Sequence, residues 1–224
     1  MKDNTWNIKK KYFKKFLSKK FYPETYILQS FFSKDYSKIN HSKKKKLKIL
    51  DIGTLYLNNL LPFEGNGNKL YGTEINKETV KLLNQIYKKK CTIKEGRNTS
   101  LPFKDNFFDI VLSINTIHYE QNMSNLNQAI LEFKRVLKKN GILFIQTVAP
   151  NHYFKKTKTK SLGNNNFKCI DKKDIRYGQK FTYLKNHFQL SKLVSSHFRK
   201  YEIGELNAKF SKRTIHSFMI KCKK

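Results

Sequence analysis

Residues 47–59 read LKILDIGTLYLNN, an apolar run that ends at Asp51 and Gly53. A short apolar run bounded by turn residues predicts a buried strand, here over residues 47–52. A strand followed by an acid and a glycine is typical of the first half of a nucleotide-binding turn. Such turns usually carry further glycines, and none follows Gly53 in this stretch. Two alternatives are therefore open: a cofactor site with an unusual loop, and a site that has lost its ligand.

Apolar runs and helical patterns alternate after this first strand. Strands are predicted at residues 70–74, 91–95, 107–114 and 141–148, and helices at 77–89 and 125–141, the second ending at Gly141. Strands that alternate with helices predict a parallel sheet covered by helices. The fold class is therefore α/β.

The two ends of the chain differ from this central part. Residues 1–40 are rich in Phe and Tyr and are predicted to form a helical cap broken at Pro23. Towards the other end, we predict a polar loop over 155–180, a helix over 181–198, and an antiparallel strand pair over 201–206 and 214–222 at the sheet edge.

The formal net charge of +31 on 224 residues suggests an anionic partner such as nucleic acid. An alternative is A/T-rich coding, which favours Lys, Asn and Ile codons and leaves lysines on solvated faces. Arginine is best suited to binding phosphates and bases, and it is scarce. The 47 basic residues include only Arg97, Arg135, Arg176, Arg199 and Arg213 as arginines. Both explanations stay open, and the coding bias is favoured.

The cysteines and the hydropathy pattern indicate an intracellular protein. The cysteines lie far apart without CxxC spacing, which favours reduced thiols over a disulfide framework or a zinc site. No apolar run reaches the roughly 20 residues of a membrane span, and the amino terminus lacks the apolar stretch of a signal peptide. We therefore expect a cytoplasmic location.

Glu74, at the end of the second predicted strand, lies 21 residues after Gly53. In a dinucleotide-binding or adenosyl-binding fold, an acid at this place accepts hydrogen bonds from ribose hydroxyls. An acid at a strand end is also a common solvated terminus. The spacing of 21 residues leaves the two roles of Glu74, ribose binding and a solvated strand end, equally favoured.

A longer set of motifs identifies a family. ILDIG, YGTEIN, LPFKDNFFDIVLSINTIHY and EFKRVLKKNGILFI follow one another within residues 49–145. This set resembles the class I S-adenosylmethionine-dependent methyltransferases, and in particular their bacterial small-molecule branch. The resemblance implies a Rossmann-like seven-stranded sheet, mostly parallel with an antiparallel last strand and helices on both faces.

The resemblance also implies a cofactor, S-adenosyl-L-methionine, and a division of the chain. A single methyltransferase-like domain over 1–224 would have a helical cap at 1–40, a cofactor-binding core at 41–150, and a substrate-side loop with the C-terminal helix and strands at 151–224. The residues implied to bind the cofactor are Asp51 and Gly53 on the methionine and ribose side, Glu74 at the ribose, Arg97 and Asn98 at the adenine, and Asn115 near the methyl group.

The chain departs from the family's G-x-G-x-G turn at two places. Leu55 and Leu57 stand where the second and third glycines are usual, so a branched side chain occupies a place where backbone normally approaches the ligand. Arg97 stands where many members carry Asp. These departures keep open the loss of cofactor binding.

The candidate catalytic residues are His118, Tyr119 and His152. His118 follows the fourth strand and is the preferred general base, because a base assists transfer to a hydroxyl; His152, after the fifth strand, is second. Tyr119 is a candidate for shaping the pocket or binding the acceptor. Each of the three has an alternative role in packing. The other histidines show no metal-ligand spacing, so no metal is predicted.

Three functions remain. The first is methyl transfer to an oxygen or nitrogen of a small-molecule acceptor, with a sugar or surface-glycan intermediate in view. The second is a non-catalytic protein with this fold, suggested by Leu55 and Leu57. The third is an RNA methyltransferase, suggested by the charge but lacking an NPPY-type tetrad, because SINT stands at 113–116. Nucleic acid is thus an open but less favoured partner, and the oligomeric state is unknown.

Overall fold

The computed structural model describes residues 22–40, 46–174 and 176–224. Residues 1–21 of the predicted cap and residues 41–45 of the predicted core lie outside these ranges. Within them, the central sheet contains β1 (Lys48–Ile52), β2 (Lys69–Glu74), β3 (Cys91–Glu95), β4 (Phe108–Ile114), β5 (Leu137–Val148), β9 (Lys200–Phe210) and β10 (Arg213–Lys223).

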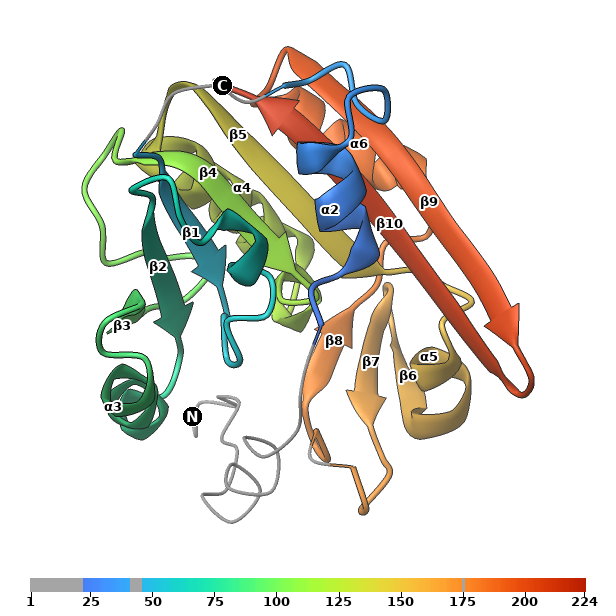
Figure 1. The fold of residues 1–224 in the computed structure, drawn as a ribbon. Helices are drawn as coiled ribbons and strands as arrows, with labels where there is room; N and C mark the ends of the chain where they lie inside the picture. Colours follow the sequence, from blue (N-terminus) through green and yellow to red (C-terminus); the bar gives the residue numbers. More distant parts are fainter. Residues whose placement is uncertain (1–21, 41–45, 175) are drawn as a thin grey trace.

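The strands lie in the order β3-β2-β1-β4-β5-β10-β9 (Figure 1). The first five strands of this order pair in parallel, while β10 is antiparallel to both β5 and β9. The predicted seven-stranded sheet, mostly parallel with an antiparallel last strand, is therefore confirmed. The predicted pair at the sheet edge is also present, and both of its strands are longer than the sequence suggested.

Helices cover both faces of the sheet, as predicted. α4 (Met123–Val136) and α6 (His187–Ser195) pack on one face, and α2 (Thr25–Phe32) and α3 (Lys77–Ile86) on the other (Figure 1). Successive strand residues point to opposite faces. Leu50 of β1 therefore joins the core under α4, while Ile49 joins the core under α2. The first strand is buried on both sides, which explains its unbroken apolar character.

The predicted helix over 125–141 is too long. α4 ends at Val136, and Leu137 has an extended backbone and begins β5. Leu137 pairs with Phe108 of β4, and the Lys138 ammonium lies 2.7 Å from the Asp109 carboxylate. These contacts with β4 favour an extended conformation, so Gly141 lies inside a strand and does not end the helix.

The loop predicted over 155–180 is also wrong. This segment contains α5 (Tyr153–Lys158), β6 (Thr159–Gly163), β7 (Asn166–Cys169) and the start of β8 (Lys180–Thr182). The three strands form a small antiparallel sheet. Asn164 and Asn165 have positive φ angles and form the hairpin turn between β6 and β7. The predicted helix over 181–198 accordingly begins only at His187, after β8.

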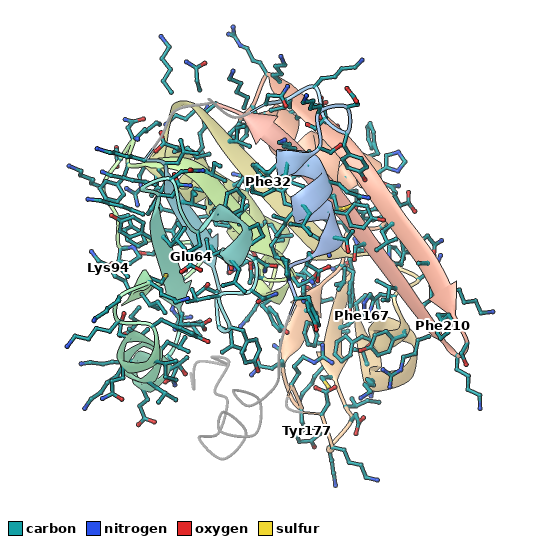
Figure 2. All side chains as sticks on the ribbon, in the orientation of Figure 1. Phe32, Glu64, Lys94, Phe167, Tyr177 and Phe210 are labelled. Carbon is teal, nitrogen blue, oxygen red and sulfur yellow. The ribbon has the colours of Figure 1, made fainter. Side chains whose placement is uncertain are left out.

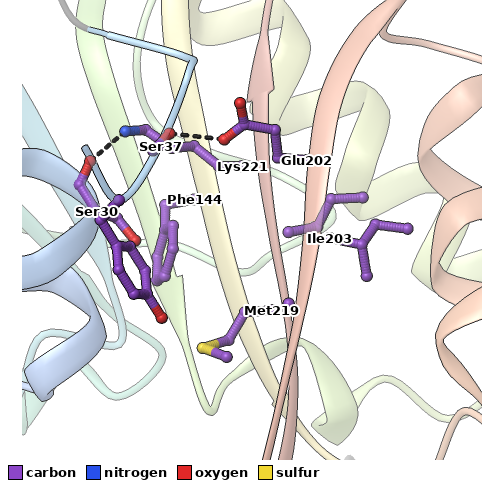
Figure 3. Close-up of a pocket in the computed structure, with 10 residues that line it drawn as sticks. Ser30, Ser37, Phe144, Glu202, Ile203, Met219 and Lys221 are labelled. Carbon is purple, nitrogen blue, oxygen red and sulfur yellow. Dashed lines mark hydrogen bonds between the residues drawn. The ribbon is translucent and has the colours of Figure 1, made fainter.

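The last turn of α2 and the segment that follows it are fixed to the edge of the sheet. The Lys221 ammonium on β10 donates to the Ser30 carbonyl oxygen, and the Glu202 carboxylate on β9 accepts from the Ser37 hydroxyl at 2.7 Å. Lys221 and Glu202 are direct cross-strand neighbours, yet each binds the segment 30–38 (Figure 3). Burial lowers the pKa of Lys221 to about 8. A small cavity of about 200 Å³ lies beside these contacts.

The surface shows scattered aromatic side chains. Phe210, at the β9–β10 turn, and Tyr177, between β7 and β8, both point outward (Figure 2). Isolated exposed aromatics of this kind are ordinary. In the described ranges, no helix has the length and apolar character needed to cross a membrane.

The LPFKD motif has a structural explanation. The Arg135 guanidinium on α4 donates to the carbonyl oxygens of Leu101 and Phe103 at 3.1 and 2.8 Å and to the carboxylate of Asp105 at 2.7 Å. Glu132, one helical turn earlier, binds the same guanidinium at 2.8 Å and accepts from the Leu101 amide. The arginine thus closes the loop before β4 onto α4, and the planar fork of its five donors suits this arrangement.

Arg135→Lys should therefore lower the free energy of unfolding by about 2 kcal/mol, because a lysine cannot satisfy the two carbonyls and two carboxylates together. Urea denaturation measures the change. Arg199→Lys, at an exposed position, is the matched control and should change stability by less than about 0.5 kcal/mol. Equal effects of the two substitutions would contradict the role given to Arg135.

Candidate functional site

A cavity of about 490 Å³ opens at the carboxyl ends of the parallel strands. Ile52 at the end of β1, Glu74 at the end of β2, Gly96 after β3 and Ile114 at the end of β4 all line it. β2 and β4 lie on opposite sides of β1, so the connection from β1 to β2 runs in one direction across the sheet and the connection from β4 to β5 runs in the other. This is the place where open α/β sheets bind their ligands.

The turn after β1 has positive φ angles at three alternate residues, and the first of the three is a glycine. Gly53, Leu55 and Leu57 have φ angles of +70°, +30° and +57°. The two leucines adopt the left-handed region, which costs a residue with a Cβ roughly 1–2 kcal/mol. Leu57 is buried in the core under α2, and Leu55 packs partly against the same core while lining the cavity. Apolar packing thus holds these two residues in an unfavourable backbone conformation.

Gly53 itself must remain a glycine. A Cβ added there would lie 2.6 Å from Cγ2 of Thr116, a residue of the loop after β4. The positive φ of Gly53 disfavours any side chain as well. This glycine therefore lets the turns after β1 and β4 approach each other beside the cavity.

Glu74 is linked to the same turn. Its carboxylate accepts from the Leu55 amide at 2.8 Å and is almost fully buried. Burial raises the pKa of Glu74 to about 7, and the backbone amides of Leu55 and Ile75 offset part of the rise. The carboxylate faces a cavity with capacity to accept further hydrogen bonds.

Asp51 lies behind the cavity and does not line it. Among the described residues, neither of its carboxylate oxygens has a donor in hydrogen-bonding geometry. Burial, with a smaller contribution from the nearby Glu74 charge, raises the pKa of Asp51 to about 8, while Thr54 and Asn59 lower it in part. A protonated Asp51 therefore accounts for this carboxyl group in an apolar setting.

The structure brings most of the predicted site residues to the cavity. Six of the nine line it, namely Gly53, Glu74, Arg97, Asn98, Asn115 and Tyr119. The Oδ1 atom of Asn115 is buried without a hydrogen-bond partner in the described part of the chain. Asn98 donates to the Glu120 carboxylate at 2.9 Å. These residues form a continuous wall from the end of β2 to the loop after β4.

The two histidines lie elsewhere. The ring of His118 is buried in an aromatic cluster, with centroids 4.5 Å from Tyr119 and 5.8 Å from Phe181. Burial, then the Arg176 charge, lowers the pKa of His118 to about 3. His152 caps α5 by accepting the Phe154 amide, and burial lowers its pKa to about 4. Neither histidine lines the cavity, and both are neutral at pH 7.

Sequence reasoning missed several residues of the cavity wall. Glu120 directly follows Tyr119, the last residue of the LPFKDNFFDIVLSINTIHY motif. Its position next to the motif was a signal that could have found it. Gln179 comes from the connection between β7 and β8, in a segment predicted as loop, and no sequence signal pointed to it. The polar residues that were missed are Thr73, Thr99, Glu120, Gln121, Asn125 and Gln179.

Residues 50–145 match the methyltransferase domain family. The match covers less than half of the 224-residue chain. A curated relative, the uncharacterized methyltransferase YcgJ of Bacillus subtilis, is 30% identical over 108 residues, which are 46% of this chain and 42% of the relative. The chain thus spans less than half the length of that relative.

Solved methyltransferase structures share the fold. A SAM-dependent methyltransferase from Methanosarcina mazei superposes with a TM-score of 0.63 at 18% identity, over 81% of this chain and 93% of that chain. The 1,6-didemethyltoxoflavin-N1-methyltransferase of Burkholderia thailandensis, whose structure holds S-adenosylhomocysteine, gives 0.55 at 11% identity, over 80% and 72% of the chains. The predicted Rossmann-like methyltransferase fold is confirmed.

The two buried carboxyls predict how the stability of the protein depends on pH. The pKa of Asp51 rises from 3.8 to about 8 and that of Glu74 from 4.5 to about 7. Between these values the folded chain keeps protons that the unfolded chain releases. The stability that these two carboxyls contribute is therefore fully present below about pH 4 and is lost progressively as the pH rises to about 8.

Asp51→Asn should make this loss shallower, because an amide does not titrate. Urea denaturation at several pH values from 5 to 8.5 measures the slope. Asp35→Asn, at an exposed position, is the control and should keep the wild-type slope. If the free energy of unfolding of Asp51→Asn fell with pH as steeply as that of the wild type, the raised pKa given to Asp51 would be contradicted.

Proposed function

We propose that the protein transfers methyl groups from S-adenosyl-L-methionine to an oxygen or nitrogen of a polar small molecule, with sugars or surface-glycan intermediates as the favoured class. The observation that carries this proposal is the cavity at the ends of β1, β2 and β4, with the Gly53 turn and the Glu74 carboxylate at its wall. The methyltransferase domain over residues 50–145 supports it.

The residues present fit the cofactor. Glu74 is an acceptor for ribose hydroxyls, and the unpartnered Oδ1 of Asn115 is an acceptor for a positively charged group. Arg97 and Asn98 follow β3 at the cavity wall, at the place given to adenine. Asp51 does not line the cavity, so we assign it no direct contact with the cofactor. When bound, the cofactor supplies an electrophilic methyl group on a sulfonium, and the chain's part is to align the acceptor and exclude water.

The other polar side chains of the cavity favour a hydroxylated acceptor. Gln121, Asn125 and Gln179 carry amides, which both donate and accept hydrogen bonds. Such groups suit the hydroxyls of a sugar. An RNA acceptor is less consistent with this wall, because Glu74 and Glu120 would repel phosphates and Arg97 is the one arginine among the described lining residues. We place this activity in the cytoplasm.

The first test concerns the ribose contact. Glu74→Gln should weaken S-adenosylhomocysteine binding about tenfold or more, because hydrogen bonds to a charged acceptor contribute about 1.5–3 kcal/mol. Isothermal titration calorimetry measures the Kd. Glu95→Gln is the matched control, since Glu95 ends β3, pairs with Glu74 and is exposed. No binding by the wild type at millimolar ligand would refute the proposal and favour a non-catalytic protein.

The second test concerns the altered turn. Leu55→Gly should tighten S-adenosylhomocysteine binding several-fold, because glycine accepts a positive φ freely and removes a side chain from the cavity wall. Leu57→Gly is the comparison, since Leu57 is buried and does not line the cavity. It should lower the free energy of unfolding by about 2–5 kcal/mol without tighter binding. Weaker binding in Leu55→Gly would contradict this account.

A further inference from the structure

A second carboxylate, Glu120, lines the cavity on the side of β4. Glu74 stands at the end of β2, whereas Glu120 follows the short 3-10 helix η2 (Ile117–Tyr119) after β4. β1 lies between these two strands. The two acids therefore reach the cavity from opposite sides of the central strand. The cofactor assignment uses Glu74 and leaves Glu120 without a role.

Glu120 is held in a defined position. Its carboxylate accepts from the Asn98 amide at 2.9 Å, and its backbone carbonyl accepts from the Thr182 hydroxyl at 2.6 Å. Its amide donates to the Ile117 carbonyl at 3.1 Å. Thr182 belongs to β8, so the small sheet and η2 fix this residue together. Such support is what a positioned acid or base requires.

The surroundings make the Glu120 carboxylate a stronger base than a free one. Burial raises its pKa, and the Asn98 hydrogen bond and the Arg97 charge offset the rise only in part. The two histidines suggested as bases lie outside the cavity wall and are weaker bases than free imidazole. Among the residues described along this wall, Glu120 combines access to the cavity, a fixed position and basicity.

We propose that Glu120 is the general base of the reaction and that the acceptor is an uncharged hydroxyl or an amine, not a carboxylate or phosphate. This inference rests on the proposed methyl transfer. The acceptor's lone pair forms the new bond to the methyl carbon, and the bond from that carbon to sulfur breaks with its electron pair left on sulfur. The acceptor's proton passes to a Glu120 carboxylate oxygen. The reaction thus removes the positive charge of the sulfonium and the negative charge of the Glu120 carboxylate.

The charge balance also selects the acceptor. An anionic nucleophile has no proton to give to Glu120 and would be repelled by it. A neutral hydroxyl or amine keeps its lone pair for the methyl carbon and donates a hydrogen bond to the carboxylate, and the amides of Gln121 and Gln179 on the same wall bind neighbouring polar groups. The acceptor end of the cavity therefore favours neutral and amino sugars over uronic acids and sugar phosphates.

The test compares Glu120→Gln with the wild type and with Glu95→Gln as control. S-adenosylhomocysteine binding is measured first, by calorimetry, and Glu120→Gln should still bind it, because the glutamine side-chain oxygen can accept from the Asn98 amide as the carboxylate does. Absence of binding by the wild type would refute the methyl-transfer proposal itself. Carboxyl ¹³C NMR on glutamate-labelled protein then follows the signal missing from Glu120→Gln, which should titrate above the pH range of exposed glutamates. Titration within that range would overturn the role of Glu120.

Activity completes the test, with methyl-labelled S-adenosylmethionine and a panel of neutral hexoses, amino hexoses, uronic acids and hexose phosphates. We expect wild-type transfer to neutral or amino sugars, a kcat at least about 100-fold lower in Glu120→Gln, and partial activity in Glu120→Asp. The low-pH limb of the wild-type profile should follow the pKa of the NMR signal. Transfer only to the anionic sugars, no transfer with cofactor bound, or an unchanged rate and pH profile in Glu120→Gln would each overturn the proposal.

Discussion

The hydrogen bond from the Leu55 amide to the Glu74 carboxylate, 2.8 Å long, connects the two strands on which the cavity depends. It draws the turn after β1 towards the end of β2 and leaves the turn in a left-handed conformation at three alternate residues. Leucines accept this conformation because the core under α2 buries one of them fully and the other in part. The turn keeps its shape through packing, where a glycine-rich turn keeps it through backbone freedom.

The sequence predicted the central sheet well, because its strands and helices are local patterns. The apolar runs of β1, β4 and β5 and the periodicity of α3 and α4 require no knowledge of distant partners. The errors occur where contacts between residues far apart in the sequence determine the secondary structure. Leu137 looks helical until its pairing with Phe108 is known, and the segment 155–180 looks like loop because its strands are short and polar. The aromatic packing of Phe181 with Tyr119 and Phe154, which supports this small sheet, is a long-range contact.

The candidate site shows the same division. Residues within motifs, such as Gly53, Glu74 and Asn115, were predicted at the cavity and lie there. His118 also belongs to a motif, but a turn of backbone after β4 directs its ring into the aromatic cluster and leaves Glu120 at the cavity wall. Sequence spacing places a residue near a site, whereas the direction of its side chain depends on the local fold. Spacing alone did not distinguish His118 from Glu120.

The small sheet, which lies between β5 and α6 in the chain, can change in evolution without changing the central sheet. Its strands pair with one another and not with the central sheet, while Gln179 and Thr182 reach the cavity wall and its support. Substitutions or length changes in β6, β7 and their turns would leave the strand order of the core intact. Related chains can therefore diverge in what this wall contacts while keeping one cofactor turn, and the hairpin at Asn164 and Asn165 is where such divergence costs least.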